Sequence, residues 1–599
     1  MTTRAVRVPV RVLLHAPMAL AVVLQLPGAA RAQFVPGLTN PALQQQQELQ
    51  QRQQELPAVQ REAAPPLVTS PDAARPPAKP ADDPQLLVEQ VRVQGARVIS
   101  ASKLEAVFAP LLSRAGQPRP VRFSQLQEAL DAASNLYRDA GYFTSRVVLP
   151  QGGFANGVLT VVAVEGFIEQ VEVIGRGTPG LKRWARFYMQ PLVSTAQKPR
   201  PIRFKQLERQ LLLMQGFGGV RFSSTLARSA SFAGSKLVLE MNPQYFSGSV
   251  GLDNNVQPLL GDYQATVQLQ SNVLTAQQPL QVNLFANYAF PYPNGLESGS
   301  LSLNTPLGNR GLRLVGLGSV ASTNSAGTSI DVGGPPITLT SSGESYLGSL
   351  ALRYPLLLGR TGSLGLSLGG EVQNSTNNTY LDGLLAVSNL TRLRVLRLGV
   401  DGTLSTPFYA SSANLQISQG LPIASAFDAA TLAQTGGALP SGSVSYTSAR
   451  LTLRHQQRLG SSNTFVTLTG SGQLTSNVLP APEDFAYGGP FLGRAYKGTY
   501  LIGDQGVAAG LELSHAFYSG QWALTPFVFG DFGTAANNGN VPISANYQAA
   551  SYGIGLRGSW STATSWEVGW AIPEGPFPAS AQRAGAANSI VYFRASLFF

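Results

Sequence analysis

The second half of this chain is built of short segments in which apolar and polar residues alternate, separated by Gly, Asn, Pro and Ser. A side-chain period of two is the period of a β-strand with one apolar face. About sixteen segments of roughly ten residues follow one another, the length expected of membrane-spanning strands. They are 245–254, 262–273, 279–290, 296–305, 312–324, 346–354, 363–373, 390–404, 411–419, 445–458, 464–477, 507–517, 522–532, 547–559, 565–573 and 588–599. The pattern predicts an all-β transmembrane barrel of about 16 antiparallel strands over residues 244–599.

The last segment shows the alternation most clearly. One face holds Val591, Phe593, Ala595, Leu597 and Phe599, and the other holds Tyr592, Arg594, Ser596 and Phe598. An apolar face beside a mixed face is typical of a strand between lipid and a wet lumen. A soluble β-sandwich, whose strands also alternate, is the alternative. The barrel is favoured because charged residues make up only 13% of the chain and an export signal precedes it. In lipid the sheet must close, since an open edge leaves backbone groups unpaired.

The first 32 residues predict export. Arginines at 4, 7 and 11 precede an apolar run at 16–26, and Ala30 and Ala32 have the spacing of a signal-peptidase site. We therefore expect residues 1–32 to be a signal peptide. An N-terminal anchor helix is the alternative, but the apolar run is too short to span a bilayer.

A low-complexity region follows the signal. Residues 33–62 are rich in Gln and Glu and favour a helix, whereas 63–84 are rich in Pro and Ala and predict an extended linker. Two readings of the first part stay open, a disordered tail or a detachable helix on a tether.

Residues 85–166 and 167–243 predict two copies of one small α/β module. Each copy has the order strand, helix, helix, strand, strand. The second helix of the first copy carries an apolar stripe through Phe123, Leu126, Leu130, Ala133 and Tyr137. Such stripes are core faces and not binding sites. A duplicated module of this size is comparable to an ordinary small domain.

The stretch from Glu483 to Gly533 stands out within the barrel half. It is a Gly-rich loop with the tip Gly493, Arg494, Ala495 and Tyr496, followed by two alternating strands, the second of which ends near Asp531. An arginine in a narrow lumen is partly desolvated and seeks a carboxylate, which its planar fork binds through two parallel hydrogen bonds. We expect Arg494 to pair with Asp531. A solvated loop arginine and a locally bonded aspartate are the alternative.

Several function classes are disfavoured. The chain has no Cys and only three His, so neither a cofactor nor a metal site is expected. Gly365 to Gly369 match the esterase pattern G-x-S-x-G, but Ser367 lies inside an alternating strand rather than a strand–turn–helix elbow. There is no phosphate-binding P-loop, and the basic residues are dispersed, so an enzyme or a nucleic-acid partner is not expected.

Several motifs together resemble the outer-membrane transporters of two-partner secretion (TpsB type), of the hemolysin secretion/activation family ShlB/FhaC/HecB. The two modules resemble POTRA domains. The resemblance covers nearly the whole chain after the signal and rests on Tyr137 to Tyr142, Ser249 to Asn254, Glu483 to Gly489 with Arg494, Gly503 to Gly506 and Phe527 to Gly533. One position departs from the family pattern: Ala495 stands where a Gly follows the arginine. Because Ala disfavours positive φ, the tip conformation is expected to differ, with Gly493 supplying some of that freedom.

The resemblance implies an outer-membrane transporter that secretes a large partner exoprotein of the TpsA type. The POTRA domains would bind unfolded cargo in the periplasm, the barrel would be the conduit, and the helix at 33–62 would plug it. Other implied partners are outer-membrane lipids, and the barrel-assembly machinery and periplasmic chaperones during biogenesis. Phe593, Leu597 and Phe599 would form a C-terminal barrel signal. An insertase that assembles other barrels is the alternative. A passive porin would not need POTRA domains.

Overall fold

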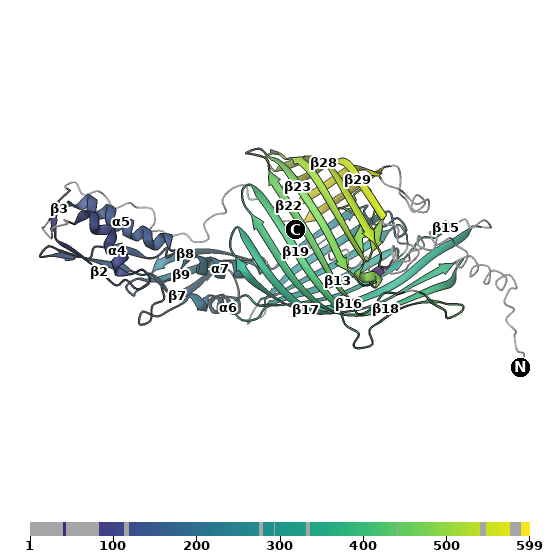
Figure 1. Cartoon of the computed structure of the whole chain (residues 1–599), viewed down its shortest axis with the longest axis horizontal. Coiled ribbons are helices and arrows are strands. Elements are labelled where there is room, and N and C mark those ends of the chain that lie inside the picture. Colours follow the sequence, from purple (N-terminus) through teal and green to yellow (C-terminus); the bar gives the residue numbers. More distant parts are fainter. Residues whose placement is uncertain are drawn as a thin grey trace, which may run out of the picture.

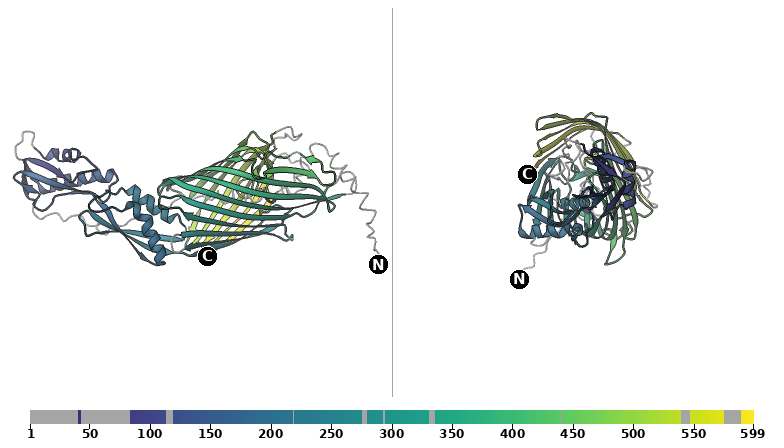
Figure 2. Two further views of the ribbon diagram at one scale, coloured as in Figure 1. Left: turned by 90° about the horizontal axis from the view of Figure 1, so that it is seen from below. Right: turned by 90° about the vertical axis from the view of Figure 1, so that its left-hand side faces the viewer.

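Two small modules lie in line at one end of the molecule, and a large barrel forms the other end (Figure 1). Figure 2 shows the same order from below, and its second panel looks along the long axis with the modules toward the viewer. None of the described helices is long and apolar enough to cross a membrane. The computed structural model describes residues 40–42, 83–112, 119–217, 219–274, 279–292, 294–330, 336–439, 441–538, 547–574 and 589–599.

Sixteen long antiparallel strands among the described residues close into one barrel. They are β10 (Phe246–Asp253), β11 (Tyr263–Leu274), β12 (Pro279–Phe290), β13 (Leu296–Pro306), β14 (Arg313–Asn324), β16 (Ile337–Leu358), β17 (Gly362–Leu381), β18 (Leu384–Ser405), β19 (Tyr409–Gly420), β22 (Thr447–Arg458), β23 (Thr464–Thr475), β26 (Gln505–His515), β28 (Trp522–Ala536), β29 (Tyr547–Trp560), β30 (Thr564–Glu574) and β31 (Ile590–Phe598). The short strands β15 (Thr328–Ile330), β20 (Phe427–Leu432), β21 (Ala438–Leu439) and β27 (Phe517–Ser519) extend the same sheet. The first and last long strands close it, because β10 pairs with β31 from Ser249 opposite Phe598 to Asp253 opposite Arg594. The predicted number and direction of the strands are confirmed.

Three strand lengths were predicted wrongly. β16, β17 and β18 have 22, 20 and 22 residues, whereas the alternation indicated only 346–354, 363–373 and 390–404. The longest missed parts, 337–345 and 374–381, are rich in Ser, Thr and Asn. They form strands because each residue pairs across the hairpin, for example Ser345 with Ser375 and Asn377 with Asn389. The alternation marks the lipid-facing part of a strand and not its ends.

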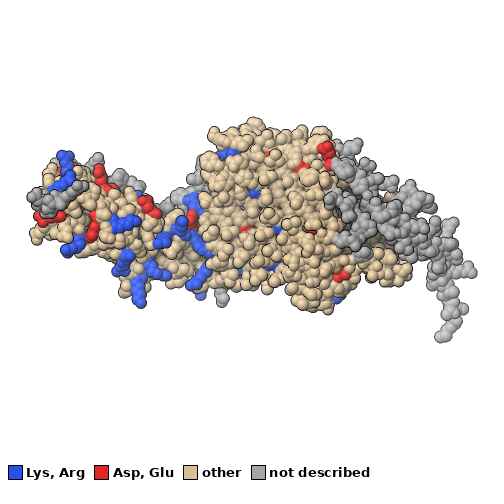
Figure 3. Space-filling view, in the orientation of Figure 1, with Lys and Arg blue, Asp and Glu red and all other residues tan. Residues whose placement is uncertain are grey.

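The outer face of the barrel is apolar. On β16 the alternate residues Tyr346, Leu350, Leu352 and Tyr354 are exposed, while Ser345 and Leu347 on either side of Tyr346 are buried. The barrel surface in Figure 3 is almost free of charged side chains, whereas Lys, Arg, Asp and Glu gather on the modules. This apolar outer face forms a band around the barrel that suits contact with lipid acyl chains.

The first module has a mixed sheet covered by two helices. Its elements are β1 (Gln85–Val88), β2 (Gln90–Gln94), α4 (Ala101–Phe108), β3 (Arg119–Arg122), α5 (Phe123–Asp139), β4 (Arg146–Val148), β5 (Phe154–Ala155) and β6 (Val158–Val164). β2 runs parallel to β6, and β4 runs antiparallel to it. The predicted first strand is two strands, since β1 leaves this sheet to pair with β3.

The predicted stripe of α5 faces the core of the first module, where Leu126, Ala133 and Tyr137 are fully buried. Tyr137 donates a hydrogen bond to Glu165 Oε1 at 3.0 Å, and the same oxygen accepts from the backbone N–H groups of Arg97 and Val98. Burial and the neighbouring carboxylate raise the pKa of Tyr137, so its hydroxyl remains a donor at all ordinary pH values.

The second module repeats this order. Its elements are β7 (Phe167–Gly175), α6 (Pro179–Met189), α7 (Phe204–Gln215), β8 (Val220–Arg228) and β9 (Gly234–Pro243). β7 runs parallel to β9, and β8 runs antiparallel to β9. The two copies therefore place equivalent strands in equivalent positions.

Only three residues of the predicted helix at 33–62 are described. Asn40 and Ala42 are buried, and the Ala42 N–H donates to Asn40 Oδ1 at 2.9 Å. Pro41 lies against Gly343 of β16, so these residues are held at the barrel wall. The rest of that segment, residues 1–32 and most of the linker lie outside the described residues. The plug helix stays a prediction.

The second module is fastened to the near rim of the barrel by Arg313, at the start of β14. Its guanidinium donates to the carbonyl oxygens of Gly216 (2.9 Å) and Leu213 (3.2 Å) and lies 4.1 Å from the centre of the Phe217 ring. These carbonyls lie at the C-terminal end of α7, which carries partial negative charge. Gln210 adds a hydrogen bond to the Asn309 carbonyl at 2.7 Å.

Replacing Arg313 with Ala should loosen this attachment. We expect a loss of about 3 kcal/mol of docking free energy, since charge-assisted hydrogen bonds and a cation–π contact disappear together. Spin labels on the second module and on the barrel rim should then give a broadened distance distribution. The control is Arg310→Ala, which removes an exposed arginine from the same turn. An unchanged, narrow distribution for Arg313→Ala would contradict the assigned role.

Candidate functional site

The connection between β23 and β26 folds into the barrel instead of extending away from it. Its two limbs pair as β24 (Phe485–Tyr487) and β25 (Leu501–Gly503). The tip residues Arg494, Ala495 and Tyr496 are only 6%, 2% and 3% exposed. The loop is therefore held inside the lumen by side-chain contacts.

The tip accommodates Ala495 without backbone strain. Positive φ angles occur at Gly488, Gly489, Gly493 and Gly498, and Ala495 is not among the described residues with positive φ. Gly493 has φ of +81°, and a Cβ there would lie 2.8 Å from the Tyr487 ring. Gly493 thus supplies both the turn and the close approach, which removes the expected difficulty at Ala495.

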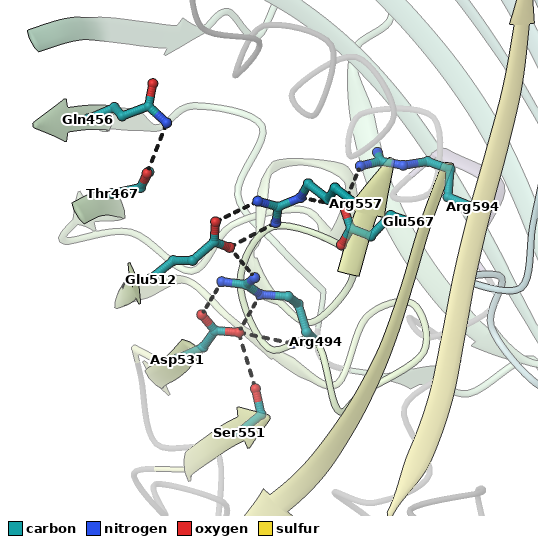
Figure 4. A network of polar contacts seen from close by, with 9 residues as sticks. All are labelled: Gln456, Thr467, Arg494, Glu512, Asp531, Ser551, Arg557, Glu567 and Arg594. Carbon is teal, nitrogen blue, oxygen red and sulfur yellow. Dashed lines mark hydrogen bonds and ion pairs between the residues drawn. The ribbon is translucent and has the colours of Figure 1, made fainter. Parts of the chain in front are cut away.

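Arg494 binds two carboxylates at once. Its Nε and Nη2 lie 3.2 and 3.3 Å from the two oxygens of Asp531 on β28, and its Nη1 lies 2.7 Å from Glu512 Oε2 on β26 (Figure 4). The backbone N–H of Arg494 and the hydroxyl of Ser551 also donate to Asp531 Oδ2, each at 3.2 Å. Asp531 is 3% and Glu512 6% exposed, so all three charges are desolvated together. The geometry is the bidentate pair expected from the sequence, with Glu512 as an additional partner.

The pair is one end of a longer ionic chain along the wall. Arg557 on β29 contacts Glu512 through Nη2 at 2.8 Å and Glu567 on β30 through Nε at 2.8 Å. Arg594 on β31 contacts Glu567 at 3.4 Å (Figure 4). We call these six residues the tip network: Arg494, Glu512, Asp531, Arg557, Glu567 and Arg594. Three arginines and three carboxylates alternate along this chain of contacts. Ion pairs therefore connect the loop tip to five neighbouring strands, β26, β28, β29, β30 and β31.

Aromatic rings form the floor beneath the tip network. Arg494 lies 3.8 Å from the centre of the Phe529 ring, and Arg557 lies 4.0 Å from that of Phe527. Each ring lies over a glycine of the next strand, because Phe529 pairs with Gly553 and Phe527 with Gly555. A side chain at either glycine would displace a ring, and the cation above it would lose its π face.

Tyr496 anchors the other side of the tip. Its hydroxyl donates to the carbonyl of Ala550 at 3.0 Å, and its ring stacks on Tyr500 with 4.0 Å between the centroids. All four predicted tip residues thus lie within one buried cluster.

A second ionic clasp holds the base of the loop. Glu483, only 3% exposed, accepts from Arg397 of β18 at 2.7 and 3.2 Å, and the same guanidinium binds Glu371 of β17. Arg450 of β22 donates to the backbone carbonyls of Glu483 and Asp484. We call Glu371, Arg397, Arg450 and Glu483 the base clasp. The loop therefore bridges the lumen, with its base on one wall and its tip on another.

Sequence reasoning did not assign Glu512, Arg557, Glu567, Arg594 or the base clasp to the site. A usable signal was present, since each of the strand residues occupies an inward position of an alternating strand, where a charge must find a partner. Which charge meets which partner depends on strand register and could not be obtained from spacing.

The proposed C-terminal signal residues lie at the barrel seam. Leu597 and Phe599 are 52% and 57% exposed, and Phe593 lies 6.0 Å from Tyr263 between ring centroids. The backbone of Phe599 exchanges two hydrogen bonds with Gly248. Their predicted common face is the outer one, while their role as a signal stays a prediction.

Two family models match the chain. The first, described as haemolysin secretion/activation protein ShlB/FhaC/HecB, matches residues 234–558. The chain belongs to this family. The second, a POTRA domain of the ShlB type, matches residues 86–166. As a family member the protein is an outer-membrane transporter of the two-partner secretion type, with its barrel in the outer membrane and its POTRA domains in the periplasm. The resemblance seen in the sequence is confirmed, and the transporter is favoured over the insertase.

Curated relatives and solved structures agree with this assignment. An outer membrane transporter CdiB of Escherichia coli O6:K15:H31 is 23% identical over 495 residues, covering 80% of this chain and 76% of the relative. The CdiB of Dickeya dadantii is 23% identical over 368 residues, covering 60% of this chain and 61% of the relative. The structure of CdiB from Escherichia coli matches with a TM-score of 0.66 at 19% identity, covering 93% of this chain and 98% of the other. CdiB from Acinetobacter baumannii matches with a TM-score of 0.57 at 15% identity, covering 93% of this chain and 98% of the other. These transporters share the fold.

Proposed function

We propose that this transporter exports one large partner exoprotein through its barrel, and that the inward loop must stay clasped at its tip for export to occur. The observation that carries the proposal is Arg494, which is buried with two carboxylates of the wall inside a closed barrel. A buried arginine shared between two acids gives a loop one defined position, because any displacement leaves charges unpaired.

The POTRA domains would receive the cargo. Among the described strands, β2 and β7 each pair with one neighbour only, so each has an edge that can accept an extended segment. Binding through backbone hydrogen bonds needs no particular cargo sequence. Export would draw its direction from folding of the cargo outside, since the sequence has no P-loop for ATP.

The N-terminal helix, the lipids and the assembly partners complete the proposal. The segment 33–62 would close the lumen until cargo arrives, which the burial of Asn40 and Ala42 at the barrel wall supports. Outer-membrane lipids would contact the apolar band. The barrel-assembly machinery and periplasmic chaperones would act during biogenesis, with Phe593, Leu597 and Phe599 as the C-terminal signal.

Co-expression tests the proposal directly. The chain is expressed in a Gram-negative host together with an N-terminal fragment of the large exoprotein encoded beside it, and the fragment is measured in the medium. We expect export only when the transporter is present. An insertase would instead change the amount of other outer-membrane barrels. No export of the fragment from cells with a correctly folded barrel would refute the proposed function.

A further inference from the structure

The lumen wall formed by β11, β12 and β13 carries no ionisable side chain at any described inward position of these strands. Most of its outward positions are apolar, and Tyr263, Leu284 and Leu301 among them are exposed. Glu297 of β13 is also exposed on this outer face. Its described inward positions include eight amides, which we call the amide face: Gln264, Gln268, Gln270, Asn272, Gln281, Asn283, Asn287 and Asn304.

The opposite walls hold the charges. The tip network lies on β26 and β28 to β31, and the base clasp lies on β17, β18 and β22. The loop spans between these charged walls. The strands of the amide face therefore hold no member of the tip network or of the base clasp.

The amide face begins at the second POTRA domain. Asn272, at the end of β11, donates through its side chain to the carbonyl of Gln244 at 2.9 Å and through its backbone to that of Tyr245 at 3.0 Å. Both carbonyls belong to the segment that joins β9 to β10. A chain leaving the POTRA domain at this junction would meet the amide face first.

The far end of the amide face lines an open space beneath the loop. A cavity of about 730 Å³ is lined by Gln264 and Gln268, by Phe491 of the loop, and on its remaining side by charged residues that include Arg557, Glu567 and Arg594 of the tip network. Gln268 is exposed to it. The face thus runs from the POTRA junction to the underside of the loop.

The chemistry of the amide face suits an extended polypeptide. Each amide group offers two N–H donors and a carbonyl acceptor, so it can bind both the C=O and the N–H of a peptide backbone. Most described bonds of the amide face are neutral, for example Asn287 to Gln264 at 3.1 Å and Asn283 to Ser302 at 3.1 Å. The exception is Gln264, which donates to Asp253 Oδ1 at 2.8 Å. Neutral bonds of this kind exchange readily, whereas charge-assisted bonds would hold a passing residue.

We infer that the amide face is the surface along which the cargo passes, as an extended polypeptide whose backbone groups bind the amides in turn. The inference rests on the proposed function and adds the route and its chemistry. The cargo crosses the lumen along the wall of β11 to β13, while the loop stays clasped to the strands that carry the tip network and the base clasp.

Crosslinking to a stalled cargo tests the route. The probe is the N-terminal exoprotein fragment fused at its C-terminus to a tightly folded domain, which halts export midway. A photoreactive residue is placed at Gln268 or Asn283 on the amide face. The matched control is Gln456, an inward amide of β22 that bonds Thr467. We expect crosslinks to the fragment from the amide face and few from Gln456. Crosslinks that are equal or stronger at Gln456 would overturn the inference.

A charge substitution provides an independent test. Gln268→Lys should slow export of the unfused fragment about tenfold, the effect of one charge-assisted bond that holds the cargo, whereas Gln456→Lys should leave it within about twofold. Barrel folding is checked for each variant by its heat-dependent gel migration. The crosslinking test introduces no charge into the lumen, so it still tests the inference if Gln268→Lys does not fold. Normal export by a folded Gln268→Lys would also overturn the inference. Failure of the wild type to export the fragment would instead refute the proposed function, so the two failures are distinguishable.

Discussion

Arg494→Ala is expected to reduce export of the partner exoprotein by about a hundredfold or more. The substitution leaves Asp531 and Glu512 buried with part of their positive charge removed, and breaking a buried ionic contact in this way costs about 3–5 kcal/mol. Glu512 keeps Arg557 as a partner, but Asp531 keeps only the Ser551 hydroxyl and a backbone N–H. The loop tip should therefore leave its position while the barrel stays closed. Export into the medium is the measurement, and gel migration reports on barrel folding.

Two further variants define the role of Arg494. Arg494→Lys should restore export only in part, since one ammonium group cannot supply the fork that spans both acids. Lys497→Ala is the matched control, because it removes a cation of the same loop that takes no part in the tip network. Wild-type export by a folded Arg494→Ala would show that the clasp is not needed.

The double charge reversal of Arg494 and Asp531 is a weak test of their pairing. The sequence alone suggests this test, because a charge exchange restores a pair that has no third partner. In the structure a carboxylate at position 494 would face Glu512, which lies 2.7 Å from the present guanidinium. We therefore expect the double reversal to restore little export. The cause is repulsion from Glu512, so this result would not contradict the pairing of Arg494 with Asp531.

Arg397→Met is expected to release the base of the loop. Glu371 and Glu483 share this one guanidinium, and without it two carboxylates face each other in a confined site. The loss is expected to be about 3–5 kcal/mol of loop anchoring. Trypsin should then cleave the loop at Arg494 or Lys497 at least tenfold faster than in the wild type, because an open loop exposes both sites.

Arg394→Met is the control for the base clasp. Arg394 lies on the same strand, β18, and bonds the neutral side chain of Asn374 and backbone carbonyls. A second variant, Arg397→Met with Glu483→Gln, removes the repulsion and should recover part of the protection. Equal cleavage rates for Arg397→Met and Arg394→Met would contradict the anchoring role.

Strand number and strand faces could be predicted because they are local properties. In β31 the alternation of Val591, Phe593 and Ala595 with Tyr592 and Arg594 assigns each side chain to lipid or lumen without knowledge of any neighbour. The two modules were likewise visible in their apolar stripes. The need of Arg494 for an acid was predictable because a buried arginine requires one. Four other acids lie in the same stretch, and Asp531 was singled out by its place late in a strand and by the family resemblance.

The extent of β16 to β18 was not predictable from alternation, because the longest parts that it missed are rich in Ser, Thr and Asn and are held by backbone pairing. The partners Glu512, Arg557 and Glu567 were missed for a related reason, since adjacent strands place them together only after their register is set.

The sequence by itself thus determined a closed barrel with an arginine-tipped loop after two α/β modules, because strand periodicity and the need to pair a buried charge act at short range. Only the tertiary structure decided that the loop bridges two walls. Glu483 and Arg397 are 86 residues apart and meet because the barrel closes. The same closure leaves β11 to β13 as a wall that holds no member of the tip network or the base clasp and whose described inward positions carry no charge. A contact across a barrel is set by strand number, tilt and register together, and no single stretch of sequence contains all three.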